Sequence, residues 1–214
     1  MPEPVGGRVA LAEALFRIGA LRFGKFPLAS GKSSSYHLDL GVVPSDAEAY
    51  RLAVSAYLAG VDQIGAGAFD VVAGVATSGV TVSSPVAYVL RKPMIYVRRE
   101  EKGHGLGELI EGAVRPGWRA LVVDVLVTTG VSMISAVEAL RRAGCTVVDA
   151  LVLVDRVEGG KENLARSGVK LSAFVDVKEL VETLYQGKKV TKRDYQAVLK
   201  QMEGGGARKE TQSP

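Results

Sequence analysis

The sequence has 214 residues, of which 47% are hydrophobic, and its 27 Lys and Arg against 23 Asp and Glu give a formal net charge of +4 at pH 7. The length fits one domain with an appendage or two small domains, and the mild basic balance suits a multiply anionic small substrate better than a nucleic acid. A single cysteine, Cys145, excludes an internal disulfide and a cysteine-based metal cluster, and no apolar run has the length of a signal peptide or membrane helix, so we expect a cytoplasmic protein without a membrane partner.

The first 58 residues are predicted to form two helices and a hairpin. Apolar residues recur at helical spacing over 9–18. The next segment has the pattern of a hairpin, with one strand ending at Leu28 and the other starting at Ser35, on either side of a Ser-Gly turn. A second amphipathic helix is predicted over 46–58.

The middle of the chain contains two predicted buried strands. After an irregular connection over 60–67, the β-branched run 70–75 predicts the first strand. It opens into a loop of small residues, 76–79, and then a helix. The second strand, 93–97, leads into a charged segment with three glycines. Such a segment cannot pack as a core, so a mobile loop is expected there.

The stretch 121–132 reads Leu-Val-Val-Asp-Val-Leu-Val-Thr-Thr-Gly-Val-Ser and precedes a helix predicted over 133–143. Only Asp124 interrupts its apolar half. The small, hydroxylated half can present N–H groups and hydroxyls to an anion at the helix N-terminus, and Gly130 permits close approach of a phosphate. Asp124 can accept hydrogen bonds from sugar hydroxyls. The pattern therefore favours a phosphorylated ribose, whereas an ordinary capped turn leaves the buried carboxylate unexplained.

The remaining predicted elements continue the alternation of strands and helices. They are a strand over 146–154, a short helix over 163–167, a strand over 169–177, and helices over 177–184 and 192–202, with a disordered polar tail from Glu203.

This alternation predicts an α/β fold with a mostly parallel sheet flanked by helices. We divide the chain into an N-terminal part (1–58), a core (59–184), and a C-terminal helix with a disordered tail (185–214). In such a sheet, ligand loops lie at the carboxyl ends of the strands. The loops that follow the four core strands ending near Val75, Val97, Val127 and Val154 should therefore meet at one edge.

The stretch around Asp124 resembles the ribose-phosphate signature of the type I phosphoribosyltransferases, which ends in Thr-Thr-Gly-x-Ser. The family pattern has two adjacent acids that hold the two ribose hydroxyls. Here the second acid is replaced by Val125. The resemblance implies an intact phosphate cradle with a weaker grip on the sugar.

The charged segment resembles the catalytic loop of one subfamily, the orotate phosphoribosyltransferases, through Arg98, Lys102, His104 and Gly105. The residues around Lys32 and Tyr36 are similar to that subfamily's N-terminal hood, and Asp-Arg-x-Glu-Gly at 155–159 is similar to a segment whose arginine faces the substrate's carboxylate. Plain structural alternatives are a solvated lysine in a turn, a solvated charged loop, and a structural salt bridge of Arg156.

The resemblance implies transfer of a phosphoribosyl group from 5-phosphoribosyl 1-diphosphate to orotate, with Mg²⁺ carried by the diphosphate and no metal ligand supplied directly by the protein. It also implies a homodimer with shared active sites. The implied catalytic residues are Arg98, Lys102, His104 and Asp124. The implied substrate-binding residues are Lys32, Tyr36, Thr77, Ser78, Arg99, Thr128, Thr129, Gly130, Val131, Ser132 and Arg156.

Two other functions stay open at this stage. Val125 favours a non-catalytic or weakly active relative that binds nucleotides as a regulator, whereas a purine phosphoribosyltransferase would share the core but not the loop at Lys102 and His104. Nucleic-acid binding through the basic residues 188–193 is disfavoured because the stretch lacks interleaved aromatic residues.

Overall fold

The computed structural model describes residues 7–27, 33–99 and 109–206. These residues divide into two compact units. Unit 1 comprises residues 53–174, and unit 2 comprises residues 7–52 together with 175–206. The helix α2 (Ala47–Ile64) passes from one unit to the other.

Unit 1 is built around a sheet in which most strands are followed by a helix. Its elements, in chain order, are β3 (Val71–Val75), α3 (Ser78–Leu90), β4 (Met94–Val97), β5 (Ile110–Glu111), β6 (Arg119–Val127), α4 (Val131–Arg142), β7 (Thr146–Asp155), α5 (Gly160–Arg166) and β8 (Lys170–Asp176), the last of which ends in unit 2.

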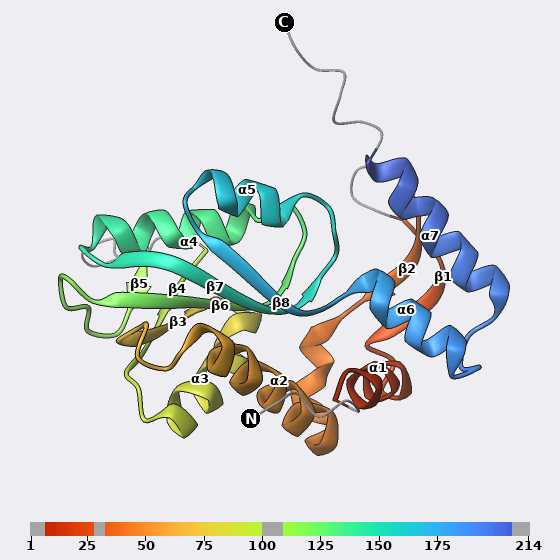
Figure 1. Ribbon diagram of the computed structural model, residues 1–214, viewed down its shortest axis with the longest axis horizontal. Helices are drawn as coiled ribbons and strands as arrows, with labels where there is room; N and C mark the ends of the chain where they lie inside the picture. The colour runs from red at the N-terminus through yellow and green to blue at the C-terminus, as the bar shows by residue number, and fades with distance from the viewer. Residues whose placement is uncertain (1–6, 28–32, 100–108, 207–214) are drawn as a thin grey trace, which may run out of the picture. The chain divides into compact units, whose positions relative to one another are not determined.

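The described strands of this sheet have the order β5-β4-β3-β6-β7-β8. β3 pairs in parallel with β4 and β6, and β6 pairs in parallel with β7. Helices α4 and α5 lie on one face of the sheet, and α3 lies on the other (Figure 1). The predicted parallel sheet between helices is thereby confirmed. Every residue of β3 is buried, as expected for a strand covered on both faces.

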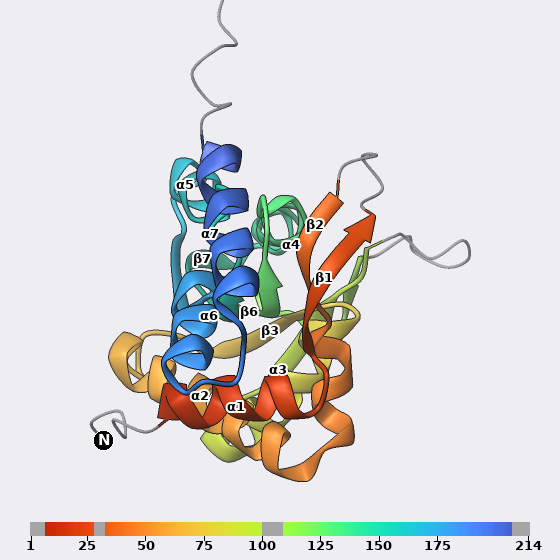
Figure 2. The same ribbon diagram turned by 90° about the vertical axis from the view of Figure 1, so that its right-hand side faces the viewer.

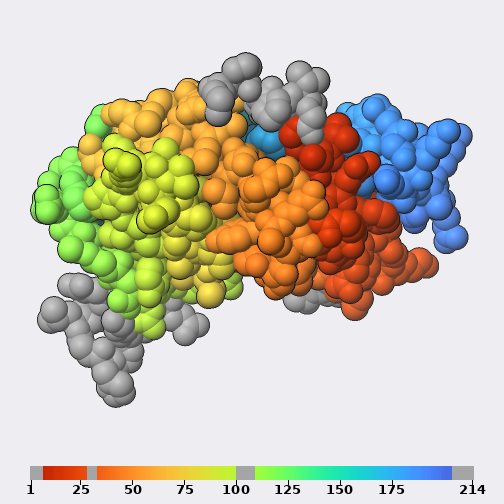
Figure 3. Space-filling view, turned by 90° about the horizontal axis from the view of Figure 1, so that it is seen from below, coloured from red at the N-terminus to blue at the C-terminus, as the bar shows by residue number. Residues whose placement is uncertain are grey.

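The apolar core under α4 explains why this helix forms where it does. Met133, Val137 and Leu140 recur at helical spacing and are at most 2% exposed. They pack against valines of β3, β6 and β7 in one cluster. On the opposite side of the sheet, α3 presents its outer surface to solvent, seen in yellow-green in Figure 3. Tyr88 of this helix is 85% exposed.

Unit 2 combines both ends of the described chain. Its elements are α1 (Gly7–Arg17), β1 (Leu21–Pro27), β2 (Ser33–Leu38), the 3₁₀ helix η1 (Leu40–Ser45), α6 (Val177–Gln186) and α7 (Lys192–Gly206). β1 and β2 form the predicted antiparallel hairpin. α6 packs on α1, and α7 packs on both α6 and β2 (Figure 2). Asp176 starts α6 with a reciprocal capping box to Glu179.

The unit boundaries differ from the predicted ones at 58 and 184. Because α6 and α7 pack on α1 and β2, the C-terminal segment joins the N-terminal segment, and neither forms a separate part. Contacts between segments so distant in the sequence leave no local pattern that could have revealed this grouping.

Two predicted helix ends were wrong, and one short strand was missed. α2 continues to Ile64, because Val61 (0% exposed) extends its buried face, and Gly60 fits where a Cβ would lie 2.7 Å from Leu151 Cδ1. The short strand β5 was not predicted. α7 continues to Gly206 through residues expected to be disordered; residues 207–214, the rest of that tail, lie outside the described residues. None of the described helices has the length and apolar character needed to cross a membrane.

Candidate functional site

The carboxyl ends of four adjacent strands define the candidate site. β4, β3, β6 and β7 are neighbours in the sheet and run parallel, so the loops that follow them lie along one edge. This arrangement confirms the predicted meeting of the four loops. The helices α3 and α4 follow the neighbouring strands β3 and β6, so both helices begin at this edge.

The loop between β6 and α4 has the geometry of an anion cradle. Gly130 caps α4 with φ +82°, a conformation that favours glycine, and no side chain caps the helix there. The first N–H groups of a helix have no intrahelical acceptor and are available to a ligand. Thr128 is half-buried, whereas Thr129, Val131 and Ser132 are exposed. The structure therefore brings together the predicted residues 128–132 around one helix N-terminus.

Asp124 is a half-buried carboxylate near the end of β6. Its Oδ1 accepts hydrogen bonds from Val125 N at 2.8 Å and from Ser78 Oγ at 3.4 Å. Burial raises its pKa from 3.8 to about 6, although these two hydrogen bonds and the charge of Arg99 act in the opposite direction. The carboxylate is therefore held in place at an energetic cost, which is typical of functional sites.

The β3–α3 loop lies directly against Asp124. Gly79 makes this approach possible, because a Cβ at Gly79 would lie 2.7 Å from Val123 O and 3.2 Å from Asp124 Oδ1. Within the same loop, the peptide bond between Ala76 and Thr77 is cis. Thr77 is exposed and Ser78 is half-buried at the start of α3, so both predicted residues lie at the edge of the sheet.

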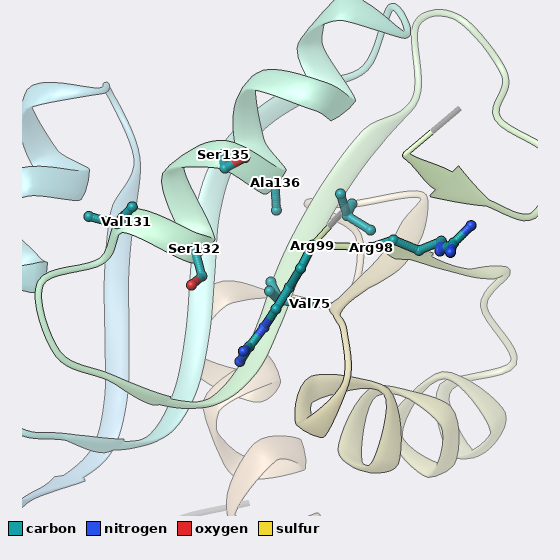
Figure 4. Close-up of a pocket in the computed structure, with 8 residues that line it drawn as sticks. Val75, Arg98, Arg99, Val131, Ser132, Ser135 and Ala136 are labelled. Atoms are coloured by element: carbon teal, nitrogen blue, oxygen red, sulfur yellow. The ribbon is translucent and has the colours of Figure 1, made fainter. Parts of the chain in front are cut away.

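Arg98 and Arg99 follow β4 and line the same pocket as Ser132 and Ser135 of α4, yet their side chains point in opposite directions (Figure 4). The Nε of Arg99 donates to Ala76 O at 3.3 Å, so this guanidinium lies beside the β3–α3 loop. The pocket has a volume of about 230 Å³. Arg99 thus adds positive charge to the edge where two helix N-termini already favour anions.

Arg98 belongs to the stem of the charged loop. Its N–H donates to Leu109 O at 2.8 Å, beside the antiparallel pairing of β4 with β5, and its Nη1 lies 3.6 Å from Glu111 Oε1. The stem fixes where the loop leaves and re-enters the sheet. Lys102 and His104 of this loop lie outside the described residues, as does most of the segment expected to be mobile.

At the end of β7, Arg156 is anchored through both its backbone and its side chain. Its N–H donates to Val127 O at 3.0 Å, and its Nη2 lies 2.9 Å from Glu158 Oε1. Asp155 Oδ1 accepts from Val157 N at 2.7 Å, and Val157 has φ +57°, which is unusual for a β-branched residue. The structural salt bridge that was the simpler interpretation of Arg156 is therefore present, at the edge of the site.

In unit 2, Tyr36 does not present its ring to solvent. It is 2% exposed, because alternate residues of β2 face the interior. His37 lies on the other face, where its ring centroid is 5.4 Å from that of Phe26. The expected contact of Tyr36 with a base thus conflicts with its burial in this structure. Lys32 lies outside the described residues.

Sequence reasoning missed two contributors to the site. Tyr57 of α2, which is 1% exposed, donates its hydroxyl to Asp124 O at 2.7 Å and so fixes the backbone of the strand where the carboxylate is placed. Gly160 at the start of α5 packs directly on the loop before α4: a Cβ there would lie 2.6 Å from Thr128 O. The Gly-Gly pair at 159–160 was a visible signal for such an approach, whereas nothing local marked Tyr57.

The described residues include no group of three or more His, Cys, Asp or Glu side chains that could hold a metal ion. At the site, the Asp124 carboxylate and the Ser78 hydroxyl lie 3.4 Å apart. Two such groups are too few to hold a Mg²⁺ by themselves, which fits an ion that arrives with a phosphorylated substrate.

Comparison with known proteins places this site in context. The model of the phosphoribosyl transferase domain family matches residues 46–183. The matched range includes the four loops at the edge of the sheet.

Individual relatives agree with this match. The chain is 41% identical over 168 residues to an orotate phosphoribosyltransferase of Cenarchaeum symbiosum, covering 78% of this chain and 84% of that one. The crystal structure of orotate phosphoribosyltransferase from Aeropyrum pernix is 42% identical, with a TM-score of 0.76 and coverage of 83% and 99%. The Mycobacterium tuberculosis orotate phosphoribosyltransferase in complex with 5-phospho-alpha-D-ribosyl 1-diphosphate is 26% identical, with a TM-score of 0.65 and coverage of 81% and 98%.

Proposed function

Because this chain belongs to the phosphoribosyl transferase domain family, we propose that it is an orotate phosphoribosyltransferase. It transfers the phosphoribosyl group of 5-phosphoribosyl 1-diphosphate to orotate and releases orotidine 5′-monophosphate and diphosphate, a step of pyrimidine nucleotide synthesis. The observation that carries the proposal is the pair of helix N-termini, α3 and α4, on neighbouring parallel strands with Asp124 between them.

The phosphate anchor is the first part of the site. Thr128 to Ser132 hold the 5′-phosphate through N–H groups of the first turn of α4 and through the hydroxyls of the loop. An anchored phosphate restricts the substrate to one orientation, so that the anomeric carbon is presented to the incoming base. Positioning of this kind supplies a large part of the rate enhancement in group transfer.

Asp124 accepts hydrogen bonds from the ribose hydroxyls. Cleavage at the anomeric carbon builds positive charge on the sugar, and a nearby carboxylate stabilises that charge. With Val125 beside it, which is 6% exposed, the sugar has lost the second acceptor that the family pattern provides. The consequence is a slower enzyme that keeps its phosphate anchor.

The diphosphate leaving group lies at the β3–α3 loop. Thr77 and Ser78 stand at the N-terminus of α3, and Arg99 donates to the carbonyl of Ala76 in the same loop. Developing negative charge on the leaving group is neutralised by these donors. Arg98, Lys102 and His104 add cationic groups from the charged loop when substrate is bound. Mg²⁺ bound to the diphosphate supplies further neutralisation.

Orotate binds beside Arg156, whose guanidinium faces the carboxylate of the base. In the free protein this guanidinium is paired with Glu158, whose side chain is 41% exposed. Lys32 and Tyr36 complete the proposed contacts; Tyr36 must leave its buried position to touch the base. We also propose a cytoplasmic homodimer in which each charged loop serves the partner's site.

The second candidate function is a regulator that binds 5-phosphoribosyl 1-diphosphate or nucleotides without turnover. Val125 is the observation that favours it, because the sugar-binding pair of acids is incomplete. The names of the relatives favour the enzyme.

The test is a product assay with 5-phosphoribosyl 1-diphosphate, Mg²⁺ and a panel of bases: orotate, uracil, adenine and hypoxanthine. We expect a nucleotide product with orotate, much less with uracil, which lacks the carboxylate, and none with the purines. A purine nucleotide as the main product would contradict the proposed specificity. Tight binding of 5-phosphoribosyl 1-diphosphate without any nucleotide product would favour the regulator.

A further inference from the structure

A side chain of α5 contacts the backbone of the phosphate loop. Asn163 Nδ2 donates to Thr129 O at 2.8 Å, across 34 positions of sequence. Asn163 is half-buried, and the loop it contacts contains the proposed phosphate anchor. Asn163 is not among the residues proposed to touch substrate. Any effect of Asn163 on substrate binding is therefore transmitted through the loop.

The position of α5 relative to the loop is fixed by direct backbone packing. A Cβ at Gly160 would lie 2.4 Å from Val127 Cγ2 and 2.6 Å from Thr128 O, and a Cβ at Gly130 would lie 3.2 Å from Gly160 O. Neither position has room for a side chain without a shift of its neighbours. This close packing sets the place at which the amide of Asn163 meets Thr129.

The hydrogen bond to Thr129 sets the orientation of one peptide plane. The peptide bond between Thr129 and Gly130 is trans, so Thr129 C=O and Gly130 N–H point in opposite directions. With the carbonyl bonded to α5, the N–H of Gly130 is turned away from Asn163. The hydrogen bond thereby fixes the direction of one N–H donor at the start of α4.

The amide of Asn163 is itself held in one orientation. Arg166 Nη1 donates to Asn163 Oδ1 at 2.9 Å, which leaves Nδ2 to face Thr129. If the amide were flipped, its oxygen would face the carbonyl of Thr129 and repel it. Arg166 is exposed and lies on the last turn of α5, so its contribution is to orientation rather than to the core.

We propose that Asn163, oriented by Arg166, is a positioning residue that sets the peptide plane of the phosphate loop and so tunes affinity for the phosphate monoester of the substrate. The proposal rests on the proposed function for the identity of that substrate. It concerns the loop alone, and a phosphate monoester that lacks the diphosphate can therefore test it.

The experiment measures binding of ribose 5-phosphate by calorimetry, and KM for 5-phosphoribosyl 1-diphosphate and for orotate, in four variants. Asn163→Ala should weaken ribose 5-phosphate binding and raise KM for 5-phosphoribosyl 1-diphosphate by about 3- to 10-fold, the range expected for one hydrogen bond. KM for orotate should change little. Arg166→Ala should shift the same constants in the same direction but less. Lys161→Ala, an exposed change on the same helix, is the matched control and should leave them unchanged.

Asn163→Asp separates positioning from support of the helix. A carboxylate of the same shape repels the Thr129 carbonyl, so binding of ribose 5-phosphate should be weaker than in Asn163→Ala. Thermal unfolding of both variants is measured beside binding. Loss of ribose 5-phosphate binding that only parallels a loss of unfolding temperature, with KM for orotate raised equally, would reduce Asn163 to a structural residue.

The outcomes distinguish this proposal from the proposed function. Wild-type turnover of orotate with ribose 5-phosphate binding unaltered in Asn163→Ala would overturn the positioning role and leave the enzyme intact. Weakened binding in Asn163→Ala and Asn163→Asp, with no turnover in any protein, would support the positioning role and contradict the proposed enzymatic activity.

Discussion

Replacing Asp124 by Asn should make the free protein more stable and the enzyme less active. In the free protein the carboxylate is held near the end of β6 by Val125 N and Ser78 Oγ, and burial raises its pKa from 3.8 to about 6. Asn has the same shape and keeps an oxygen that can accept both hydrogen bonds. It removes the charge that the fold must desolvate.

The pH dependence of this effect follows from the raised pKa. Between pH 3.8 and about 6 the unfolded chain has lost the Asp124 proton while the folded protein keeps it, so stability falls as pH rises through that window. Above pH 6 the full cost applies. A pKa change from 3.8 to about 6 corresponds to about 3 kcal/mol, since one pKa unit is worth roughly 1.4 kcal/mol. Below pH 3.8 both forms are protonated and the cost disappears.

The assay compares chemical unfolding of wild-type protein and Asp124→Asn between pH 4 and 8. The difference between the two proteins cancels the titration of other groups. We expect Asp124→Asn to be more stable by about 3 kcal/mol above pH 6 and nearly equal at pH 4. Turnover should fall by about 10- to 100-fold, because a charged acceptor for the ribose is lost. Equal stability at pH 7.5, or a gain that does not depend on pH, would show that the Asp124 carboxylate carries no cost of burial.

Four further changes test other parts of the site. Val125→Asp places a second carboxylate at a 6% exposed position and should lower thermal stability. It should also raise kcat/KM about 10-fold if the carboxylate reaches the sugar. A stable Val125→Asp protein with no turnover of orotate would contradict the proposed enzymatic activity. Lys102→Ala should lower kcat by orders of magnitude with an unchanged unfolding curve, and an unchanged rate would remove its role. Mixing Lys102→Ala with Asp124→Asn protein should restore activity through hybrid dimers, and a monomer at micromolar concentration in sedimentation would argue against shared sites. Gln201→Ala removes the acceptor that binds Ser35 N at 2.6 Å and Oγ at 2.8 Å; it should lower the unfolding temperature because the hairpin loses a polar contact with α7, and an unchanged unfolding temperature would show that this contact does not contribute to stability.

Local sequence pattern was enough to select several residues of the candidate site. Asp124 was selected because a carboxylate inside a β-branched run is costly unless it has a function, and Gly130 because a loop that binds phosphate would need a backbone free of a side chain. The meeting of the four loops followed from the topology of parallel sheets, without any knowledge of side-chain contacts.

Contacts between residues far apart in the chain could not be predicted in this way. Tyr57 and Asn163 occupy helices whose periodicity indicates only which face is buried, and their partners, Asp124 and Thr129, are 67 and 34 positions away. The burial of Tyr36 was missed because alternation along a strand reveals two faces without telling which one packs inward.

Transfer of a phosphoribosyl group to orotate at this edge of the sheet can be tested directly with the wild-type protein. The most direct test incubates the wild-type protein with orotate, 5-phosphoribosyl 1-diphosphate and Mg²⁺, and quantifies both products over time. We expect orotidine 5′-monophosphate and diphosphate in equal amounts, with a rate that depends on both substrates. Diphosphate release without the nucleotide, or no product from a protein that binds 5-phosphoribosyl 1-diphosphate, would contradict it.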